Sequence, residues 1–306
     1  RVTHVAVVHC ETTSGVLNPL AEVAAAVARS GRRLLIDAMS AFGALPLDVT
    51  EVACDAVAAS SNKCLEGVPG MGFCLVRRSA LVEARGNAHS LSLDLADQWE
   101  AMEGNGQWRF TPPVHCLLAF DRALDDFEAE GGVNGRGQRY RKNCKALARG
   151  MRELGFQTLL SEPHQAPIIM TFHMPGDPAF DFSRFYDGMA KRGFLIYPGK
   201  LTMAESFRMG CIGHLGEAEI EVALAAVLPE RARHDADDLP VRVQQRAAGR
   251  AGPRGVLGGR EDVAAVAVDA AHDALRVRER AFADVERLPR IPVVVEAVRC
   301  FHVGTA

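Results

Sequence analysis

Three short polar segments of this 306-residue chain each follow an apolar stretch that is typical of a buried strand. The segments are 9–15, 37–40 and 60–63. In an open α/β sheet, ligands collect beyond the carboxyl ends of the strands. We therefore expect one ligand to contact all three segments.

Asp37 and Lys63, 26 residues apart, form the most informative pair in these segments. An aspartate beside the pyridine nitrogen of pyridoxal phosphate keeps that nitrogen protonated, which makes the ring an electron sink, and a lysine amine condenses with the cofactor aldehyde. Glycines and a proline within 67–72 let the chain turn and present the lysine. Taken alone, Asp37 fits a helix cap or a ribose ligand equally well, so the prediction of pyridoxal phosphate rests on the pair.

Strand and helix patterns alternate through the part of the chain that holds these segments. The residues predict strands over 2–8, 33–37, 56–60 and 72–76 and an alanine-rich helix over 17–29. Strands interleaved with helices and short turns indicate an α/β domain with a mainly parallel sheet. We assign this domain, which would bind the cofactor, to residues 1–130.

A second, smaller α+β unit is predicted over 131–229. A long helical stretch leads into it, with a break at Gly131 and Gly132. The predicted helices are 113–130, 137–154, 182–192 and 217–228, and the predicted strands are 168–172, 194–196 and 206–209.

The composition excludes several classes of protein. A net charge of −3 leaves no basic footprint for nucleic acid or anionic lipid, so a small-molecule ligand is favoured. No stretch approaches the roughly 20 apolar residues of a membrane helix, and we expect a cytoplasmic protein. The eight cysteines are scattered without metal-ligand spacing, and we interpret them as reduced packing residues.

Both ends of the sequence are unusual. Because the apolar run 2–8 follows Arg1 directly, we expect that the gene encodes a further segment upstream. The residues up to Pro229 include 5 Lys and 17 Arg, whereas those from Glu230 onward include 13 Arg and no Lys, Ser, Asn, Tyr or Met. We interpret 230–306 either as a linker followed by a helix over 262–280 or, as we favour, as the product of a frameshift.

Six segments together resemble the class V, fold type I aminotransferases. They are HCETTSGVLNPL, LLIDAMSAFGALPLDV, AASSNKCLEGVPGMGF, GQWRFTPPV, LIYPGKL and ESFRMGCIG, and the resemblance covers about residues 2–228. It implies a fold type I α/β domain with a smaller α+β domain, pyridoxal phosphate as the cofactor, and a homodimer with each site at the subunit interface. Within the family, the chain is most similar to members that transfer the amino group of 2-aminoethylphosphonate to pyruvate. The alternatives are an alanine or serine:glyoxylate type of aminotransferase and a catalytically inactive fragment.

The resemblance also implies a role for individual residues around the cofactor. Lys63 would be the Schiff-base lysine that also moves protons, and Asp37 would be the partner of the pyridine nitrogen. Thr12 is similar to the residue that hydrogen-bonds the cofactor's 3′-oxygen. Met39 would pack on the ring, and Asn62 stands where the family places a polar side chain toward the phosphate.

Two further positions concern the partner subunit and the substrate. Thr111 is similar to the residue that reaches the phosphate bound to the other subunit. Arg208 matches the arginine that binds the substrate carboxylate, for which its planar fork is suited. The alternatives that need no ligand are a helix-cap role for Thr12 and a surface charge for Arg208. Lys200 fits either a solvated turn or the rim of the site.

One part of the family's site has no counterpart in the sequence. The resemblance implies a glycine-rich turn at a helix N-terminus for the phosphate and an aromatic side chain on the ring, both upstream of the run 2–8. We therefore expect the 306-residue chain by itself to bind the cofactor weakly.

Overall fold

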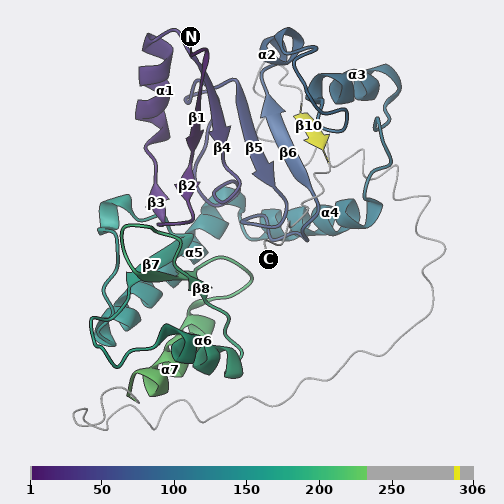
Figure 1. Cartoon of the computed structure of the whole chain (residues 1–306). Coiled ribbons are helices and arrows are strands. Elements are labelled where there is room, and N and C mark those ends of the chain that lie inside the picture. The colour runs from purple at the N-terminus through teal and green to yellow at the C-terminus, as the bar shows by residue number, and fades with distance from the viewer. Residues whose placement is uncertain (1, 233–292, 297–306) are drawn as a thin grey trace, which may run out of the picture.

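The computed structural model describes residues 2–232 and 293–296 of the chain. A five-stranded sheet forms the upper part of Figure 1, and a three-stranded sheet with further helices lies below it. The helix predicted over 262–280 lies outside the described residues.

The larger sheet has the strand order β1-β4-β5-β6-β10. Its strands are β1 (His4–Val8), β4 (Arg33–Asp37), β5 (Ala56–Ser60), β6 (Gly72–Val76) and β10 (Val293–Glu296). The first three are parallel neighbours, whereas β6 is antiparallel to both β5 and β10. The eleven residues between β5 and β6 are too few for a crossover helix, so the chain must return antiparallel.

Helix α1 (Leu20–Arg29) covers one face of this sheet and lies at its left in Figure 1. Leu20, Ala24 and Val27 repeat at helical spacing and are buried against the strands β4 and β5. The helix begins three residues later than predicted, because Val16–Leu17 is strand β3 and pairs with strand β2 (Cys10–Glu11).

Four helices lead from β6 to the smaller sheet. They are α2 (Arg78–Glu83), α3 (Leu95–Asn105), α4 (Val114–Ala129) and α5 (Gly132–Glu153). Gly131 and Gly132 have φ values of 96° and 62°, so the predicted break between α4 and α5 is confirmed. Helix α5 nevertheless starts at Gly132 and not at residue 137, and three glycines, at 132, 135 and 137, lie within its first two turns.

The smaller sheet is antiparallel, with the order β7-β9-β8. Its elements are β7 (Ile169–His173), β8 (Tyr197–Pro198) and β9 (Ser206–Gly210), with η1 (Glu162–His164), α6 (Phe182–Lys191) and α7 (Glu217–Ala232) around them. The predicted strand over 194–196 is wrong. The amide of Phe194 donates to the Met189 carbonyl at 3.0 Å, where it closes the end of α6.

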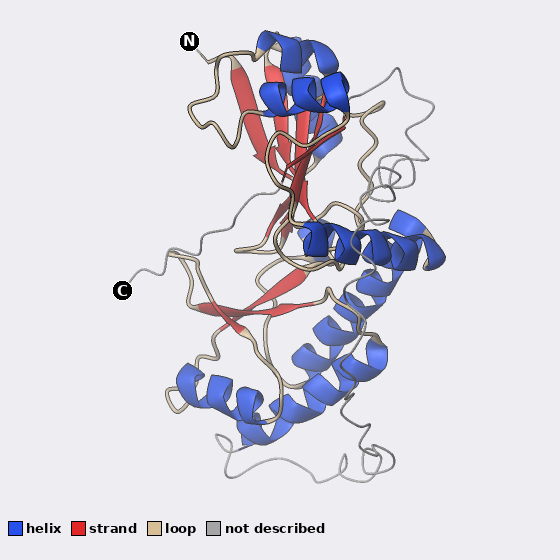
Figure 2. Ribbon diagram, turned by 90° about the vertical axis from the view of Figure 1, so that its right-hand side faces the viewer, coloured by secondary structure: helices blue, strands red, loops and turns tan. Residues whose placement is uncertain are grey.

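Helix α5 connects the two sheets, as Figure 2 shows. It packs against α4 and, further along, against β7 and α7. Its C-terminal half contributes Leu147 and Met151 to a core rich in phenylalanine that includes Phe172 and Phe207. The position of α5 therefore determines how the smaller sheet lies relative to the larger one.

Within residues 2–232 and 293–296, no helix combines the length and the apolar character needed to cross a membrane. The seven cysteines of this part form no disulfide with one another. Cys10, Cys64, Cys144 and Cys211 are buried, as their interpretation as packing residues predicts.

Gly137 on α5 is a test of this packing. A Cβ atom at this position would lie 2.4 Å from the Ala44 carbonyl oxygen, which is backbone and cannot rotate away. We expect Gly137→Ala to lower the free energy of unfolding by about 1–2 kcal/mol, because overpacking outweighs the roughly 1 kcal/mol gained in helix propensity. Thermal and urea denaturation measure this change.

Gly104→Ala is the matched control. Gly104 lies near the end of α3, and a Cβ atom there would meet no atom within 4 Å. This change is expected to raise stability by up to about 1 kcal/mol. Equal effects of the two substitutions would contradict the described contact between α5 and Ala44.

Candidate active site

The carboxyl ends of β1, β4 and β5 meet at the edge of the larger sheet that points toward α5 and the smaller sheet (Figure 1). Val8 pairs with Asp37, and Asp37 pairs with Ala58. Beyond the strands, the His9 amide donates to the Asp37 carbonyl at 2.8 Å. The polar segments 9–15, 37–40 and 60–63 therefore leave the sheet side by side, as the sequence predicts.

The side chain of Asp37 is exposed at this edge. Its Oδ1 accepts a hydrogen bond from the Met39 amide at 2.9 Å, a common local turn for aspartate. Met39 is half-buried beside it. The carboxylate thus shapes its own turn through one oxygen and keeps capacity to accept a hydrogen bond from a ligand.

Lys63 lies on a tight turn after β5. Ser61 holds this turn, because its amide donates to the Met71 carbonyl at 3.2 Å and its hydroxyl to the Val68 carbonyl at 2.8 Å. The Cys64 thiol donates to the Ser40 carbonyl at 3.2 Å, which links this turn to the one that follows Asp37. Within the described residues, the exposed Lys63 ammonium forms no hydrogen bond or ion pair, so its amine is available to a ligand.

Two neighbours of Lys63 are polar. Asn62 is exposed. The hydroxyl of Ser60 is buried and has no hydrogen-bond partner among the described residues. Burying a hydroxyl is costly unless a further group forms a hydrogen bond with it. In the sequence, only the position of Ser60 at the end of a predicted strand indicated this residue.

Arg208 on β9 is brought to the same edge. Its side chain is buried, and Nη1 donates to the Thr12 carbonyl at 2.7 Å. Nε and Nη2 both donate to the Pro198 carbonyl at 3.2 Å, and the guanidinium lies 5.6 Å from the ring centre of Tyr197. The surface-charge alternative is therefore wrong.

The charge of Arg208 is poorly compensated. Among the described residues, no carboxylate forms an ion pair with it, and burial lowers its pKa. A buried cation bound only to carbonyls and an aromatic face is costly without an anion. The guanidinium of Arg208 is thus a candidate site for an anionic group of a substrate.

The structure brings Thr12 and Arg208 together but leaves Thr111 apart. Thr12 is half-buried and contacts Arg208 through its backbone carbonyl. Thr111 is exposed on the segment before α4, and Lys200 is exposed after β8. The predicted roles of the Thr12 hydroxyl, Thr111 and Lys200 toward a ligand stay predictions.

His9 directly follows β1 and is a buried histidine with an unpartnered ring nitrogen. It is 5% exposed, and its Nδ1 atom has no hydrogen-bond partner among the described residues. Burial lowers its pKa to about 4, so the ring is neutral at neutral pH. A neutral imidazole therefore adjoins the Asp37 segment.

The comparison with protein families decides the broader assignment. The sequence profile of the family described as aminotransferase class-V matches residues 1–190. The chain belongs to the class V aminotransferases. The resemblance seen in the sequence segments is thereby confirmed.

Several curated proteins similar to this class V aminotransferase chain carry the same name. The 2-aminoethylphosphonate–pyruvate transaminase 1 of Paraburkholderia xenovorans is 58% identical over 217 residues, which cover 71% of this chain and 56% of that protein. The 2-aminoethylphosphonate–pyruvate transaminase of Pseudomonas fluorescens is 53% identical over 226 residues, which cover 74% and 61%. The chain thus spans less than two thirds of the length of these relatives.

Solved structures confirm the predicted fold type I α/β architecture of this aminotransferase chain. A ureidoglycine–glyoxylate aminotransferase from Bacillus subtilis matches with a TM-score of 0.68 at 24% identity, over 90% of this chain and 65% of that one. A pyridoxamine–pyruvate aminotransferase from Mesorhizobium loti matches with a TM-score of 0.69 at 24% identity, over 76% and 60%. At such identity these structures show the fold alone.

The buried state of His9 predicts a pH dependence of stability. In the unfolded chain a histidine takes up a proton below about pH 6.5, whereas folded His9 stays neutral down to about pH 4. The unfolded state therefore binds more protons between these values, and stability falls as the pH drops through this range. At pH 5 the expected loss is about 2 kcal/mol relative to pH 7.5.

Urea denaturation at pH 7.5 and pH 5 measures this loss. His9→Gln is expected to remove most of it, whatever its effect at pH 7.5. His89→Gln, a change at an exposed histidine, serves as the control and should leave the loss unchanged. An unchanged loss in His9→Gln would show that burial does not hold this ring neutral.

Proposed function

We propose that this chain forms the larger part of a pyridoxal phosphate-dependent aminotransferase that transfers the amino group of 2-aminoethylphosphonate to pyruvate. The products would be phosphonoacetaldehyde and alanine. The observation that carries the proposal is the meeting of Asp37, Lys63 and the buried Arg208 at one edge of the sheet. The shared name of the curated relatives supports the choice of substrates.

The residues at this edge fit the cofactor in their chemistry. Lys63 offers an amine without a partner among the described residues, and Asp37 offers an exposed carboxylate. The unpartnered Ser60 hydroxyl and the Asn62 amide stand beside Lys63 as donors for oxygen atoms of a ligand. When bound, the cofactor supplies the electron sink that makes a proton on the amine-bearing carbon of the substrate acidic.

The chain's own residues would divide the work as follows. Lys63 would hold the cofactor covalently and, as the free amine, take a proton from the substrate carbon and return it. Asp37 would keep the proton on the pyridine nitrogen. Met39 would pack on the ring, and the Thr12 hydroxyl would donate to the 3′-oxygen.

Arg208 would bind the carboxylate of pyruvate or the phosphonate of the amino donor. Three of its N–H groups are used by the carbonyls of Thr12 and Pro198. A guanidinium has five N–H donors, so two stay available for an anion. An anion there would also compensate the buried charge.

The remaining features of the proposal concern organisation. Residues 1–130 would bind the cofactor, and 131–229 would complete the substrate side. A cytoplasmic homodimer would bring Thr111 of one copy to the cofactor phosphate of the other. The molar mass of the particle in solution, measured by sedimentation, tests whether the chain forms a dimer.

The assignment of Lys63 can be tested on the 306-residue chain itself. An accessible amine is enough for condensation with an aldehyde, even where the cofactor binds weakly. After incubation with pyridoxal phosphate and borohydride reduction, we expect the pyridoxyl group mainly on Lys63, as mapped by peptide mass spectrometry. The other four lysines at 142, 145, 191 and 200 serve as internal controls. A label mainly on Lys200 would overturn the assignment.

The preference for an amino donor has to be measured on a protein of the relatives' full length. We suggest a chimera in which the matching residues of this chain replace those of the Paraburkholderia xenovorans relative, and a measurement of alanine formation from pyruvate. We expect 2-aminoethylphosphonate to be at least about a hundredfold better than serine in kcat/KM, because loss of matched charged contacts costs about 3 kcal/mol or more. A preference for serine with glyoxylate would replace the proposed substrates.

A further inference from the structure

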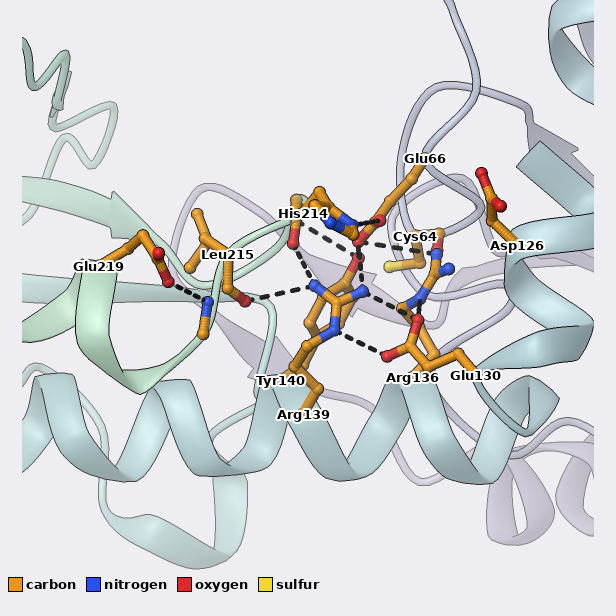
Figure 3. Close-up of polar contacts among 12 residues, drawn as sticks. Cys64, Glu66, Asp126, Glu130, Arg136, Arg139, Tyr140, His214, Leu215 and Glu219 are labelled. Atoms are coloured by element: carbon orange, nitrogen blue, oxygen red, sulfur yellow. Dashed lines mark hydrogen bonds and ion pairs between the residues drawn. The ribbon is translucent and has the colours of Figure 1, made fainter. Parts of the chain in front are cut away.

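A cluster of charged side chains lies behind the Lys63 turn, on the side of α5 (Figure 3). Arg136, Arg139 and Tyr140 project from α5, and Glu66 and Glu130 lie between them. Arg139 forms ion pairs with Glu66 at 2.9 Å and with Glu130 at 2.7 Å, and Arg136 pairs with Glu130 at 2.6 Å. The side chain of Arg136 is 2% exposed and that of Glu66 13%, whereas Arg139 and Glu130 are 21% and 24% exposed, so the network is largely but not fully buried.

One end of the network holds the turn that bears Lys63. Glu66 is three residues beyond Lys63, and its amide donates to the Lys63 carbonyl at 2.9 Å. Its φ of 58° is the only positive value at a non-glycine residue in the described part of the chain. Such a backbone persists only where its surroundings hold it. Here the Glu66 carboxylate accepts hydrogen bonds from Arg139 and from the hydroxyl of buried Tyr140.

A second contact from α5 fixes the same turn. Arg136 donates from Nη1 to the carbonyl of Cys64, the residue directly after Lys63. Cys64 in turn donates to Ser40 in the segment that follows Asp37. The network therefore reaches the Asp37 side of the site as well as the Lys63 side.

The other end of the network holds the chain after the strand of Arg208. Arg139 donates to the carbonyls of Gly213 and Leu215, and the Gly213 amide donates to the Tyr140 hydroxyl at 3.3 Å. Asn143, one turn further along α5, donates to Leu215 at 3.0 Å. These acceptors follow β9 within five residues. Arg139 and Tyr140 thus contact both the lysine turn and the segment beyond Arg208.

The positive and negative charges of the network balance, which favours one arrangement of its side chains. Two guanidinium groups face two carboxylates, and the hydrogen bond from Arg139 holds the pKa of Glu130 below its usual range. Burial and the bond to Glu66 raise the pKa of Tyr140, which keeps its hydroxyl protonated as a donor. Loss of the Glu66 charge would leave the two arginines with a single carboxylate between them.

We propose that Glu66 is a positioning residue, which through Arg139 and Tyr140 fixes the Lys63 turn relative to the segment 213–215 that follows the strand of Arg208. This inference rests on the proposed function for the roles of Lys63 and Arg208. The coupling of the two segments, however, is a property of the chain alone. It would keep the reactive amine and the anion-binding guanidinium at a constant separation.

The test compares the 306-residue chain with Glu66→Gln, which removes the charge and keeps the size of the side chain. Amide hydrogen exchange is followed by mass spectrometry in peptides that cover 60–70 and 211–216. We expect exchange to become about tenfold faster in both segments together, and to stay unchanged in β7. Faster exchange in 60–70 alone, or equally throughout the chain, overturns the coupling.

Glu219→Gln is the matched control for this experiment. Glu219 accepts from the Gly216 amide at 2.7 Å and, among the described residues, has no contact with Arg139. Its substitution should leave the exchange of 60–70 unchanged. If Glu66→Gln does not fold, Tyr140→Phe removes only the hydroxyl between Glu66 and Gly213, and faster exchange in the same two segments is again expected.

A second readout separates positioning from a merely structural role. Reductive labelling with pyridoxal phosphate gives the preference for Lys63 over Lys142 and Lys191. This preference should fall severalfold in Glu66→Gln and return in Glu66→Asp, which restores the charge. An unchanged preference in Glu66→Gln overturns the positioning role. Absence of Lys63 labelling in the parent chain would instead contradict the proposed function, while the exchange data still decide the coupling.

Discussion

The parallel pairing of β4 with β5 is the constraint on which the rest of the site depends. Parallel neighbours release their chains at the same edge, so Asp37 and the Lys63 turn emerge together although 26 residues separate them. Antiparallel pairing would place them at opposite ends of the sheet. The hydrogen bond from Ala38 to Ala58 at 2.9 Å continues this pairing beyond the last residue of β4. The hydrogen bond from the Cys64 thiol to the Ser40 carbonyl then joins the two turns directly.

The arginines around this edge differ in whether a carboxylate compensates their charge. The cluster of Arg136, Arg139, Glu66 and Glu130 is internally matched, so it stabilises an arrangement and needs no ligand. Arg208 is buried without a matching carboxylate among the described residues. Only the second kind of cation gains from an incoming anion, because the first has already formed its ion pairs. Arg136 and Arg139 on α5 therefore differ in role from Arg208 on β9.

The sequence predicted the elements of the larger sheet more accurately than those of the smaller one. Strands 33–37, 56–60 and 72–76 were bounded correctly, because short apolar runs end there at turn residues. Helix α3 was not predicted, because only Ala96 and Gln98 are buried along it and its apolar pattern is weak. The Glu66 network had no sequence signal, because Glu66 and Arg139 are 73 residues apart and meet only through the packing of α5. The common edge of Asp37 and Lys63 was predictable because Asp37 ends β4 and Lys63 follows β5, strands of the same sheet. The orphaned atoms of Ser60 and His9 required the structure.

We propose that Asp37 keeps the pyridine nitrogen of pyridoxal phosphate protonated at this edge. Nuclear magnetic resonance of the cofactor labelled with ¹⁵N at that nitrogen, bound to the chain completed to its relatives' length, measures the protonation directly. The account predicts a protonated nitrogen near neutral pH in the parent protein and an unprotonated one in Asp37→Asn. An unprotonated nitrogen in the parent, or the same chemical shift in both proteins, would contradict it.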